Sequence, residues 1–547
     1  MKLIFQPREF ERLEGVHSAR GEPEALLDKT QIPAQGYELR INTDSIQLRA
    51  SDSAGLFYGR QTLNEIYGQY SGAPVPCCRI VDWPDLANRG YMLDVSRDRV
   101  PTMEHLFHLV DTLAALRYNQ LQLYTEHTFA YSRHKQVWSN ASPLTAAEIR
   151  KLDSYCRERY IELVANQNSF GHMERWLEHD AYRHLAECPE GFRHPISGEW
   201  RPQGSVIKPD AGSLEFLDGL YSELLPNFSS RKFNIGGDEP WELGEGASAA
   251  RVRDEGKHKV YADFLAQVCG LATQHGAEPM CWADVLFEEP SSIGNLPDAI
   301  RPIIWGYEVE HPFETQCAIL AELSREFYVA PGDSTWTSFT GRSPTMLANV
   351  RSAAAAGKMF GAAGLLMTHW GDGGHPQSWP ICLPGIVWAG LCSWNVDVEE
   401  PALKAGLQSL LCDENGAYVD ALLECGKMDA SLDVPLVNRS YLAHVNQLNG
   451  AKRRGFQPKP SRPSLLNLIG SCQAWIDALG KAKLGSEDAS CLIDELKIAL
   501  SMNKYVASRC VGAEDVEQID ELRELYKKCW HYRSRSGGLG DSLAKHF

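Results

Sequence analysis

The chain has 547 residues and a formal net charge of −17 at pH 7, with 44% hydrophobic and 23% charged residues. This length suffices for two to four domains with a large core, and the composition is that of an ordinary globular protein. Acidic residues are spread along the whole chain, which argues against a nucleic-acid or anionic-membrane partner. No stretch approaches the roughly 18 apolar residues that a membrane helix needs.

The amino terminus has too short an apolar run for a signal peptide. Fifteen cysteines are scattered, and Cys77-Cys78 is their one close pair, without the CxxC spacing typical of zinc sites. Buried free thiols are the expected state, which indicates a reducing compartment. We therefore expect a soluble, cytoplasmic protein.

Residues 1–85 are predicted to form a small α+β domain. Residues 37–41 and 45–49 alternate between apolar and polar like two strands, with a turn at 42–44 between them. Residues 54–67 then place apolar side chains at helical spacing.

Residues 86–400 have a different sequence pattern, in which short apolar runs alternate with helical stretches such as 103–116 and 147–159. About eight strand–helix units in about 300 residues predict a (β/α)₈ TIM barrel. A doubly wound sheet is the competing fold, and the number of units favours the barrel. The expected strands are Tyr91–Val95, Leu121–Tyr124, Ile161–Ala165, Lys232–Ile235, Pro279–Ala283, Pro302–Trp305, Phe327–Ala330 and Leu365–Thr368.

Residues 401–547 are predicted to be a helical C-terminal region. Amphipathic helical patterns cover 464–479, 488–506 and 513–530, after a Pro- and Lys-rich linker at 457–460. Residues 534–539 are predicted to be a loop. This region is expected to shape the pocket of the barrel or to form a homodimer interface.

The most informative segment is 232–242, where a β-rich run ends in two glycines followed by Asp238 and Glu239. Glycines allow a sharp bend, and the acids would stand at the carboxyl end of a barrel strand, where this fold keeps its chemistry. Adjacent acids repel, so one tends to keep a proton while the other stays ionised. That combination suits cleavage of a glycosidic bond, although by itself it could be a solvated turn.

Other strand ends carry side chains that are typical of a sugar-binding site. Tryptophan packs on the apolar face of a pyranose, and arginine and carboxylates bind its hydroxyls. One such tryptophan is more often core than ligand, but four at consecutive strand ends favour a site. The candidates are Arg97, Glu126, His172, Trp282, Trp305, Trp336, Trp370 and Asp372.

Together these segments resemble glycoside hydrolase family 20, the β-N-acetylhexosaminidases, over residues 35–395. The strongest match is Gly-Gly-Asp-Glu at 236–239, and the segment 89–97 is similar to the first barrel strand of the family. Phe170-Gly171-His172 and Trp370-Gly371-Asp372 add to the resemblance.

The resemblance implies that Glu239 is the general acid/base and that Asp238 orients the 2-acetamido group of the substrate. In this family the acetamido carbonyl attacks the anomeric carbon and forms an oxazolinium intermediate, so no protein carboxylate acts as nucleophile. Arg97 would bind the 3- and 4-hydroxyls, and His172 with Glu126 would tune the proton affinity of the acid. No metal or organic cofactor is implied.

The resemblance also assigns aromatic walls to Trp282, Trp305 and Trp370. Asp372 stands where the family usually has a glutamate for the 4- and 6-hydroxyls, and Asn234 replaces the usual histidine before Ile-Gly-Gly-Asp-Glu. No tyrosine clearly matches the one that holds the acetamido carbonyl. Trp336 lies in that region, and its indole N–H could donate instead.

We therefore expect a retaining exo-β-N-acetylhexosaminidase that releases terminal GlcNAc or GalNAc from small glycans. A relative specific for GalNAc or for a modified hexosamine is one alternative, motivated by Asp372 and Asn234. A sugar-binding barrel without turnover is another, against which the retention of Asp238 and Glu239 argues. A metal-dependent hydrolase is a third, for which the sequence lacks a ligand cluster at motif spacing.

Overall fold

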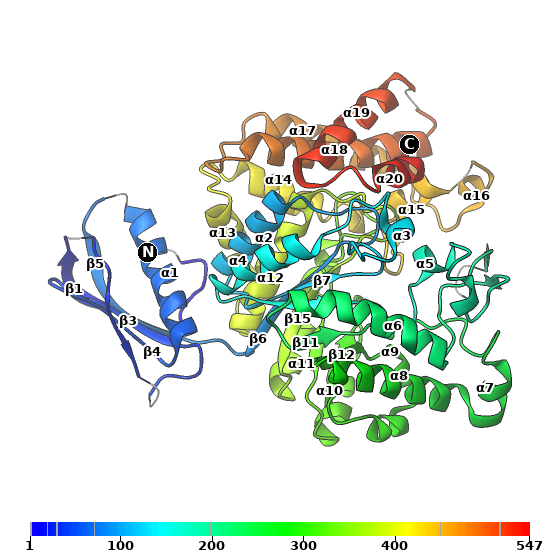
Figure 1. Cartoon of the computed structure of the whole chain (residues 1–547). Helices are drawn as coiled ribbons and strands as arrows, with labels where there is room; N and C mark the ends of the chain where they lie inside the picture. The colour runs from blue at the N-terminus through cyan, green and yellow to red at the C-terminus, as the bar shows by residue number, and fades with distance from the viewer. Residues whose placement is uncertain are drawn as a thin grey trace.

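The computed structural model describes residues 3–18, 20–28, 31–70, 72–195, 198–448, 450–513 and 516–547. A small domain of strands and one helix precedes a closed parallel barrel, and helices follow the barrel to the end of the chain (Figure 1). The predicted fold class is therefore confirmed.

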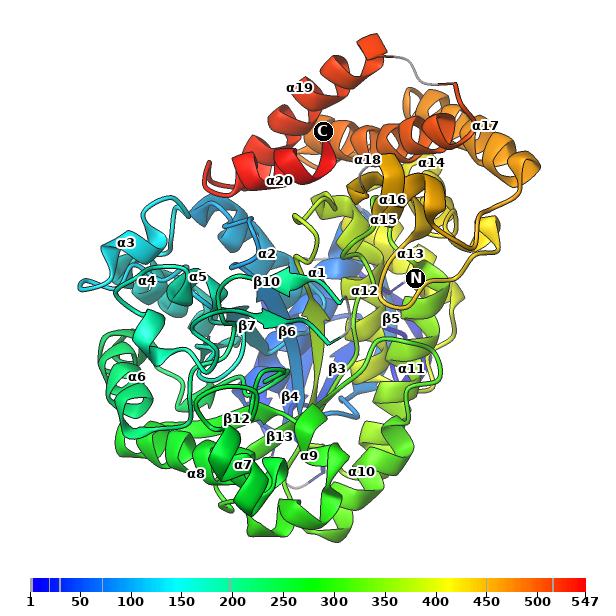
Figure 2. The ribbon, with the colours of Figure 1, turned by 90° about the vertical axis from the view of Figure 1, so that its right-hand side faces the viewer.

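All eight predicted barrel strands form, and each pairs in parallel with its neighbours until β8 closes the ring against β11. Closure excludes the doubly wound alternative. The carboxyl ends of the strands face the viewer in Figure 2. The strands are β6 (Asn88–Asp94), β7 (Gln120–Tyr124), β8 (Glu162–Asn166), β11 (Lys232–Asn234), β12 (Glu278–Trp282), β13 (Arg301–Trp305), β14 (Tyr328–Ala330) and β15 (Gly364–His369).

Helices surround the barrel because their apolar stripes pack on its outer face. Threonine side chains cap two of them: Thr102 Oγ1 accepts from the backbone N–H of His105, and Thr145 forms a capping box with Glu148. The larger helices are α2 (Met103–Ala115), α4 (Ala146–Arg157), α6 (Ala211–Leu224), α8 (Lys257–Gln274), α10 (Phe313–Glu322), α11 (Ser343–Met359) and α12 (Trp379–Trp394). Shorter elements in the loops are α3 (Lys135–Trp138), α5 (Glu174–Leu177), β9 (Phe192–Arg193), β10 (Trp200–Arg201), α7 (Ala249–Glu255) and α9 (Asp284–Glu288).

The N-terminal domain is a five-stranded sheet in the order β1-β5-β3-β4-β2, with helix α1 (Ser53–Tyr70) packed on β3 and β4. The hairpin of β3 (Tyr37–Ile41) and β4 (Ile46–Ala50) and the helix match the prediction. The two edge strands, β1 (Glu9–His17) and β2 (Glu24–Leu27), were not predicted, because most of their side chains are exposed and show no clear alternation. The fifth strand is β5 (Val75–Asp82).

Buried polar contacts join this domain to the end of the barrel opposite the active-site rim. Arg117 Nη1 lies 2.6 Å from Asp82 Oδ2 and its guanidinium stacks on Trp394. Trp394 Nε1 donates to the same Asp82 oxygen at 3.0 Å. One end of the barrel therefore contacts the N-terminal domain, and the other end carries the loops around the site.

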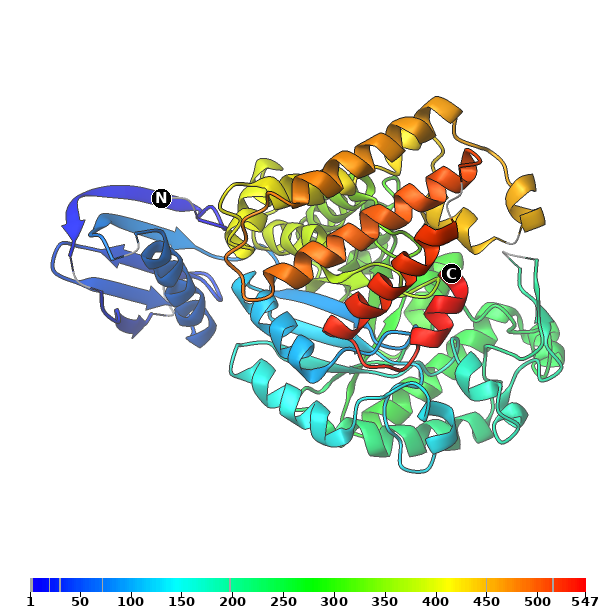
Figure 3. The same ribbon diagram turned by 90° about the horizontal axis from the view of Figure 1, so that it is seen from above.

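The C-terminal helices lie across the barrel in Figure 3, and none of the described helices is long and apolar enough to cross a membrane. Lys545 in the last helix forms an ion pair with the buried Asp98 in the loop after β6. The predicted loop at 534–539 forms over residues 534–538, and Leu539 already begins that helix. The helices are α13 (Pro401–Leu410), α14 (Ala417–Cys425), α15 (Tyr441–Gln447), α16 (Gly450–Gly455), α17 (Arg462–Leu479), α18 (Ala489–Cys510), α19 (Val516–Arg533) and α20 (Leu539–His546).

Candidate active site

The turn after β11 positions the two adjacent acids. Gly236 and Gly237 have φ of 75° and 94°, which only glycine adopts without strain, and a Cβ at Gly236 would lie 2.6 Å from Asn168 Oδ1. Glu239 has φ of 48°, an uncommon conformation for a residue with a side chain. Strained backbone of this kind is concentrated at functional sites, where the surrounding structure maintains it.

Asp238 is buried, and its two oxygens have different surroundings. Oδ2 lies 3.1 Å from His172 Nε2, whereas Oδ1 has no hydrogen-bond partner in the described part of the chain. A buried acceptor without a donor is costly unless a ligand supplies one. Because Asp238 lines the main pocket of the barrel end, this oxygen can accept from an N–H group of a bound substrate.

His172 links the two acids to Arg97. Its Nε2 lies 3.6 Å from Glu239 Oε2, and its Nδ1 lies 3.4 Å from Arg97 Nη2. Burial lowers the pKa of His172, but the Asp238 carboxylate outweighs burial and brings the pKa to about 10. An imidazolium therefore lies beside Asp238 at neutral pH.

Glu239 has the surroundings of a carboxylic acid that keeps its proton. Burial raises its pKa, the charges of Asp238 and Asp372 raise it further, and His172 and Arg97 oppose them. Its side chain is still 31% exposed, so the carboxyl is accessible from the pocket. A carboxyl with a raised pKa next to a second carboxyl is the arrangement that acid catalysis beside an anion needs.

Asp284, which was not predicted from the sequence, contacts the backbone of Glu239. Its Oδ2 accepts from the backbone N–H of Glu239 at 3.1 Å, and its Oδ1 accepts from Trp305 Nε1 at 3.3 Å. Burial raises the pKa of Asp284, and Asp238 adds to the effect. The signal that could have revealed it is its place two residues after Trp282, at the end of β12.

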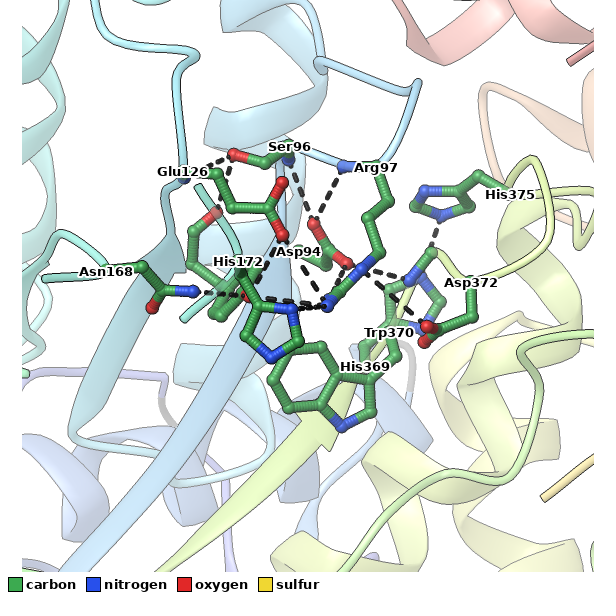
Figure 4. A network of polar contacts seen from close by, with 12 residues as sticks. Asp94, Ser96, Arg97, Glu126, Asn168, His172, His369, Trp370, Asp372 and His375 are labelled. Carbon is green, nitrogen blue, oxygen red and sulfur yellow. Dashed lines mark hydrogen bonds and ion pairs between the residues drawn. The ribbon is translucent and has the colours of Figure 1, made fainter. Parts of the chain in front are cut away.

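Arg97 lies at the centre of a cluster of acids at the ends of β6, β7 and β15 (Figure 4). Its Nη1 lies 3.0 Å from Asp94 Oδ2, and its Nε lies 3.6 Å from Asp372 Oδ1. The guanidinium also stacks on Tyr124 and Trp370, with 4.9 and 5.0 Å to the ring centroids. It is 19% exposed, so a donor edge remains available to a ligand.

Glu126 lies beside Arg97 and has no direct contact with Glu239 among the described interactions. Its Oε1 lies 3.5 Å from Arg97 Nη2 and accepts from the Tyr124 hydroxyl at 3.0 Å. Burial raises the pKa of Glu126, while Arg97 and His172 lower it. Glu126 can therefore influence the pKa of Glu239 only through Arg97 and His172.

The four predicted tryptophans line one cavity of about 450 Å³ together with Asp238 and Glu239. Trp282 and Trp370 pack at 5.7 Å between centroids, and both are buried. Aromatic faces around a polar floor are the expected lining of a pyranose pocket. The lining residues are Arg97, His172, Glu174, His194, Arg201, Ser205, Asp238, Glu239, Trp241, Trp282, Trp305, Tyr307, Trp336, Thr337, Trp370, Asp372, Asn438 and Arg439.

Tyr307 adds a hydroxyl to this aromatic wall that the sequence comparison did not place. It stacks on Trp305 at 5.2 Å and meets Trp336 edge-on at 4.9 Å. Its oxygen accepts from Trp370 Nε1 at 2.8 Å, and the hydroxyl also contacts the Thr368 side chain. The signal available was its position two residues after the end of β13.

Asn234, the departure from the usual histidine, has a local role in the turn. Its Oδ1 accepts from the backbone N–H of Gly236 at 3.0 Å, and its Nδ2 donates to Gln122 Oε1 at 3.2 Å. The amide therefore stabilises the glycine turn from inside the barrel.

The mouth of the pocket includes residues from two segments that had no assigned role. Arg201 comes from the β9–β10 hairpin, and Asn438 and Arg439 come from the C-terminal region. The backbone N–H of Ser440 donates to the carbonyl of Thr337 at 3.0 Å, which attaches this segment to the rim. The C-terminal region thus helps to shape the pocket, as one of the two expectations for it required.

Two family models match the chain in the order of its domains. The model described as glycosyl hydrolase family 20, domain 2, matches residues 9–83. The model described as glycosyl hydrolase family 20, catalytic domain, matches residues 87–360, which is half of the chain.

Relatives and solved structures agree with these models. A beta-hexosaminidase of Akkermansia muciniphila is 26% identical over 47% of this chain and 57% of its own length, and human hexosaminidase D is 22% identical over 38% and 43%. The chain therefore spans about half the length of these relatives. The fold is similar to that of Flavobacterium johnsoniae chitobiase, with a TM-score of 0.61 and 14% identity over 96% of this chain and 98% of the other. It is also similar to a Streptomyces plicatus beta-hexosaminidase solved with GlcNAc, with a TM-score of 0.55 and 19% identity over 72% and 82%. With its catalytic-domain match over half its length and with the acid pair in the matched barrel, the chain belongs to glycoside hydrolase family 20.

Proposed function

We propose that the protein is a retaining exo-β-N-acetylhexosaminidase that hydrolyses terminal β-linked GlcNAc or GalNAc with assistance from the substrate's acetamido group. The observation that carries this proposal is the unpartnered Oδ1 of Asp238 beside Glu239, whose pKa is raised by burial. The first can accept from an acetamido N–H, and the second can protonate a leaving group.

In the first step the acetamido oxygen forms a bond to the anomeric carbon while the glycosidic C–O bond breaks. Glu239 gives its proton to the departing oxygen, and the sugar becomes an oxazolinium. Asp238, held in place by its hydrogen bond with His172, stabilises the positive charge that develops on the acetamido nitrogen.

In the second step Glu239, now a carboxylate, takes a proton from a water that attacks the anomeric carbon. The oxazolinium ring opens and returns the acetamido group, so two inversions give net retention at the anomeric carbon. Tyr307, whose side chain lines the pocket, is the donor we favour for the acetamido carbonyl, with Trp336 as the alternative.

Exo action is supported by the chemistry at the Arg97 end of the pocket. Arg97 and Asp372 lie 3.6 Å apart and would bind neighbouring hydroxyls, which are free only on a terminal sugar. Asp372 is the residue that we expect to contact the 4-hydroxyl, whose orientation distinguishes GlcNAc from GalNAc.

Initial rates on the p-nitrophenyl β-glycosides of GlcNAc, GalNAc and glucose test the proposal. Turnover of the two acetamido sugars without turnover of the glucoside is expected, and their ratio gives the preference of the site. Equal cleavage of the glucoside would rule out acetamido assistance. Failure on all three would favour a sugar-binding role or a modified substrate.

We also propose that the protein works in a reducing compartment. All fifteen cysteines are free, and twelve of them are buried. Fractionation of the native host would test this, and recovery with an extracellular marker would contradict it.

A further inference from the structure

Three buried polar side chains form a network next to the sugar site and take no part in the proposed chemistry. Asp333 follows β14, His369 ends β15, and His375 lies in the loop between β15 and α12. All three are buried. Because they come from two separate stretches of the chain, no motif spacing in the sequence indicated that they meet.

Two hydrogen bonds join the members of this Asp-His-His network. Asp333 Oδ2 lies 2.6 Å from His369 Nδ1, and His369 Nε2 lies 3.0 Å from His375 Nε2. The other oxygen of Asp333 accepts from the backbone N–H and the hydroxyl of Thr335, at 3.2 and 2.8 Å. The carboxylate is therefore fixed at one end of the network, and both nitrogens of His369 have partners.

The surrounding charges set the direction in which the network donates its protons. Burial lowers the pKa of His369, but its contacts with Cys382 and Asp333 outweigh burial and raise that pKa well above its ordinary value. Burial lowers the pKa of His375, and the charges of His369 and Arg99 lower it further. His369 is therefore the cation, and it donates from Nδ1 to Asp333 and from Nε2 to His375. Because Nε2 of the neutral His375 accepts, its proton is on Nδ1.

This Nδ1–H of His375 faces the loop that carries Arg97. A Cβ at Gly371 would lie 2.6 Å from His375 Nδ1 and 2.9 Å from the carbonyl oxygen of Arg97, so only a glycine fits between the two. Nδ1 has no full hydrogen bond in the described part of the chain, but the Arg97 carbonyl is near enough to favour a proton on the ring. The backbone N–H of His375 donates to the carbonyl of Gly371 at 3.0 Å. His375 thus contacts both loops, as Figure 4 shows.

Asp94 joins the same two loops by a second set of contacts. Its Oδ2 accepts from the backbone N–H of Gly371 at 3.0 Å and lies 3.0 Å from Arg97 Nη1. The next residue after Gly371 is Asp372, whose Oδ1 lies 3.6 Å from Arg97 Nε. The relative position of Arg97 and Asp372, the two residues expected to bind sugar hydroxyls, therefore depends on the contacts that Gly371 makes with Asp94 and His375.

Two observations argue against a purely structural role for the network. A buried ion pair such as that of Asp333 and His369 adds little net stability, because the desolvation of both charges opposes their attraction. His375 also has a φ of 49°, and strained backbone of this kind is concentrated at functional sites.

We propose that Asp333, His369 and His375 are positioning residues that hold Arg97 and Asp372 in the arrangement that binds the sugar hydroxyls. None of the three is among the described residues that line the sugar cavity. The inference rests on the proposed function, because it concerns binding of the same hexosamine. Hydroxyls away from the scissile bond are bound alike in the ground state and the transition state, so loss of the network should raise KM more than it lowers kcat.

Asp333→Asn tests the proposal by reversing the hydrogen bonds of the network. Beside an uncharged amide His369 becomes neutral and accepts at Nε2, so His375 has to donate from its own Nε2. His375 Nδ1 then turns a lone pair toward the carbonyl oxygen of Arg97, and the two acceptors repel. KM for p-nitrophenyl β-GlcNAc should rise about tenfold, while kcat should change less than about threefold.

His375→Asn is a second variant that keeps the proposal testable if Asp333→Asn does not fold. Asparagine tolerates the left-handed backbone of this position. The substitution removes the contact with the Arg97 loop, so it should raise KM in the same way as Asp333→Asn.

Asp82→Asn is the matched control, because it removes a buried carboxylate from an ion pair at the other end of the barrel. It should lower Tm, as Asp333→Asn should, but leave KM unchanged. Proton NMR adds a measurement without substrate. The N–H of His369 that donates to Asp333 over 2.6 Å should give a far-downfield resonance in the wild type, which Asp333→Asn should remove.

A wild-type KM in either folded variant would overturn the proposal, and so would an equal rise of KM in Asp82→Asn. A wild-type spectrum without the downfield resonance would overturn it as well, because His369 would then not be the cation. Failure of the wild type to hydrolyse any acetamido substrate would instead contradict the proposed function, so the two failures are distinguishable.

Discussion

The two ends of the barrel both contain buried arginines, but the arginines are satisfied to different degrees. Arg89, at the end facing the N-terminal domain, donates to the carbonyls of Arg117, Leu86 and Ala87 and to the Tyr58 hydroxyl at 2.7 to 3.1 Å. Its neighbour Arg117 is paired just as closely with Asp82. Both arginines are held by several short contacts.

At the opposite end, Arg97 has one short ion pair with Asp94 and two longer ones, at 3.5 and 3.6 Å. An oxygen of Asp238 lacks a partner there, and His172 and Glu239 have φ values of 58° and 48°. The difference indicates where a ligand binds. Polar networks in which every group has a partner stabilise the fold, whereas networks with unpartnered groups can contact a substrate.

The largest effects on activity should come from substitutions at the end of the barrel that contains Asp238 and Glu239. Glu239→Gln and Asp238→Asn should each lower kcat on acetamido substrates by about a thousandfold, because one removes the proton donor and the other the anion. Steady-state kinetics and a thermal melt of each variant check this.

The loss in Glu239→Gln should be greatest for substrates with poor leaving groups, which need the proton most. Glu239→Gln should leave Tm unchanged, whereas Asp238→Asn should lower it, because the buried His172 loses the carboxylate that holds its proton. Wild-type rates on natural-type disaccharides in Glu239→Gln would show that another residue is the acid.

At the end facing the N-terminal domain, Arg117→Met should lower the free energy of unfolding by about 3 to 5 kcal/mol, because Asp82 would remain buried without its cation. KM should not change, as Arg117 is remote from the pocket. Urea denaturation measures the loss.

The double variant Arg117→Met/Asp82→Asn is the control, and it should recover a large part of that stability. If Arg117→Met left stability unchanged but reduced kcat, the assignment of stability to one end of the barrel and of catalysis to the other would be wrong.

An intermediate effect is expected for His172→Asn, a substitution that tolerates the positive φ of this position. Because His172 lowers the pKa of Glu239, its loss should raise that pKa and move the alkaline limb of kcat/KM to higher pH. The rate at neutral pH should fall about tenfold, since Asp238 loses its partner.

The free energy of unfolding should also depend on pH through the protonation of His172. Its pKa is about 10 in the folded protein against an ordinary value of 6.5, so its contribution is complete below about pH 6.5. That contribution is lost as the pH rises through 10. The difference in unfolding free energy between wild type and His172→Asn should therefore shrink over this interval, and a difference that grows would contradict the assignment.

The smallest effect is expected for Asp372→Glu, which lengthens an acid that is 45% exposed at the rim. The ratio of kcat/KM for GlcNAc and GalNAc substrates should change by about three- to tenfold, because one carboxylate contact to the 4-hydroxyl would move. An unchanged ratio would assign the discrimination to another residue. Thermal stability should be unaffected.

The sequence predicted the barrel well because each of its strands is a short apolar run between helical repeats. Strands β1 and β2 could not be found in this way, since a solvated edge strand carries no alternation. The acid pair and the tryptophans were predictable from strand ends and from family resemblance.

Other parts of the site depend on packing that no local pattern encodes. Asp284 acts through the backbone of Glu239, and Tyr307 through a contact with Trp370. Arg439 reaches the pocket from beyond the barrel, and its distance along the chain from the acids gave no hint of proximity.

The most direct test of acetamido assistance is a series of p-nitrophenyl β-glucosaminides whose N-acyl group carries no, one, two or three fluorines. Fluorine withdraws electrons from the carbonyl oxygen, so a nucleophilic acetamido group should make kcat/KM fall steeply, by about a hundredfold or more across the series. Rates that stay within about twofold would contradict the mechanism, because the carbonyl would then take no part in the attack.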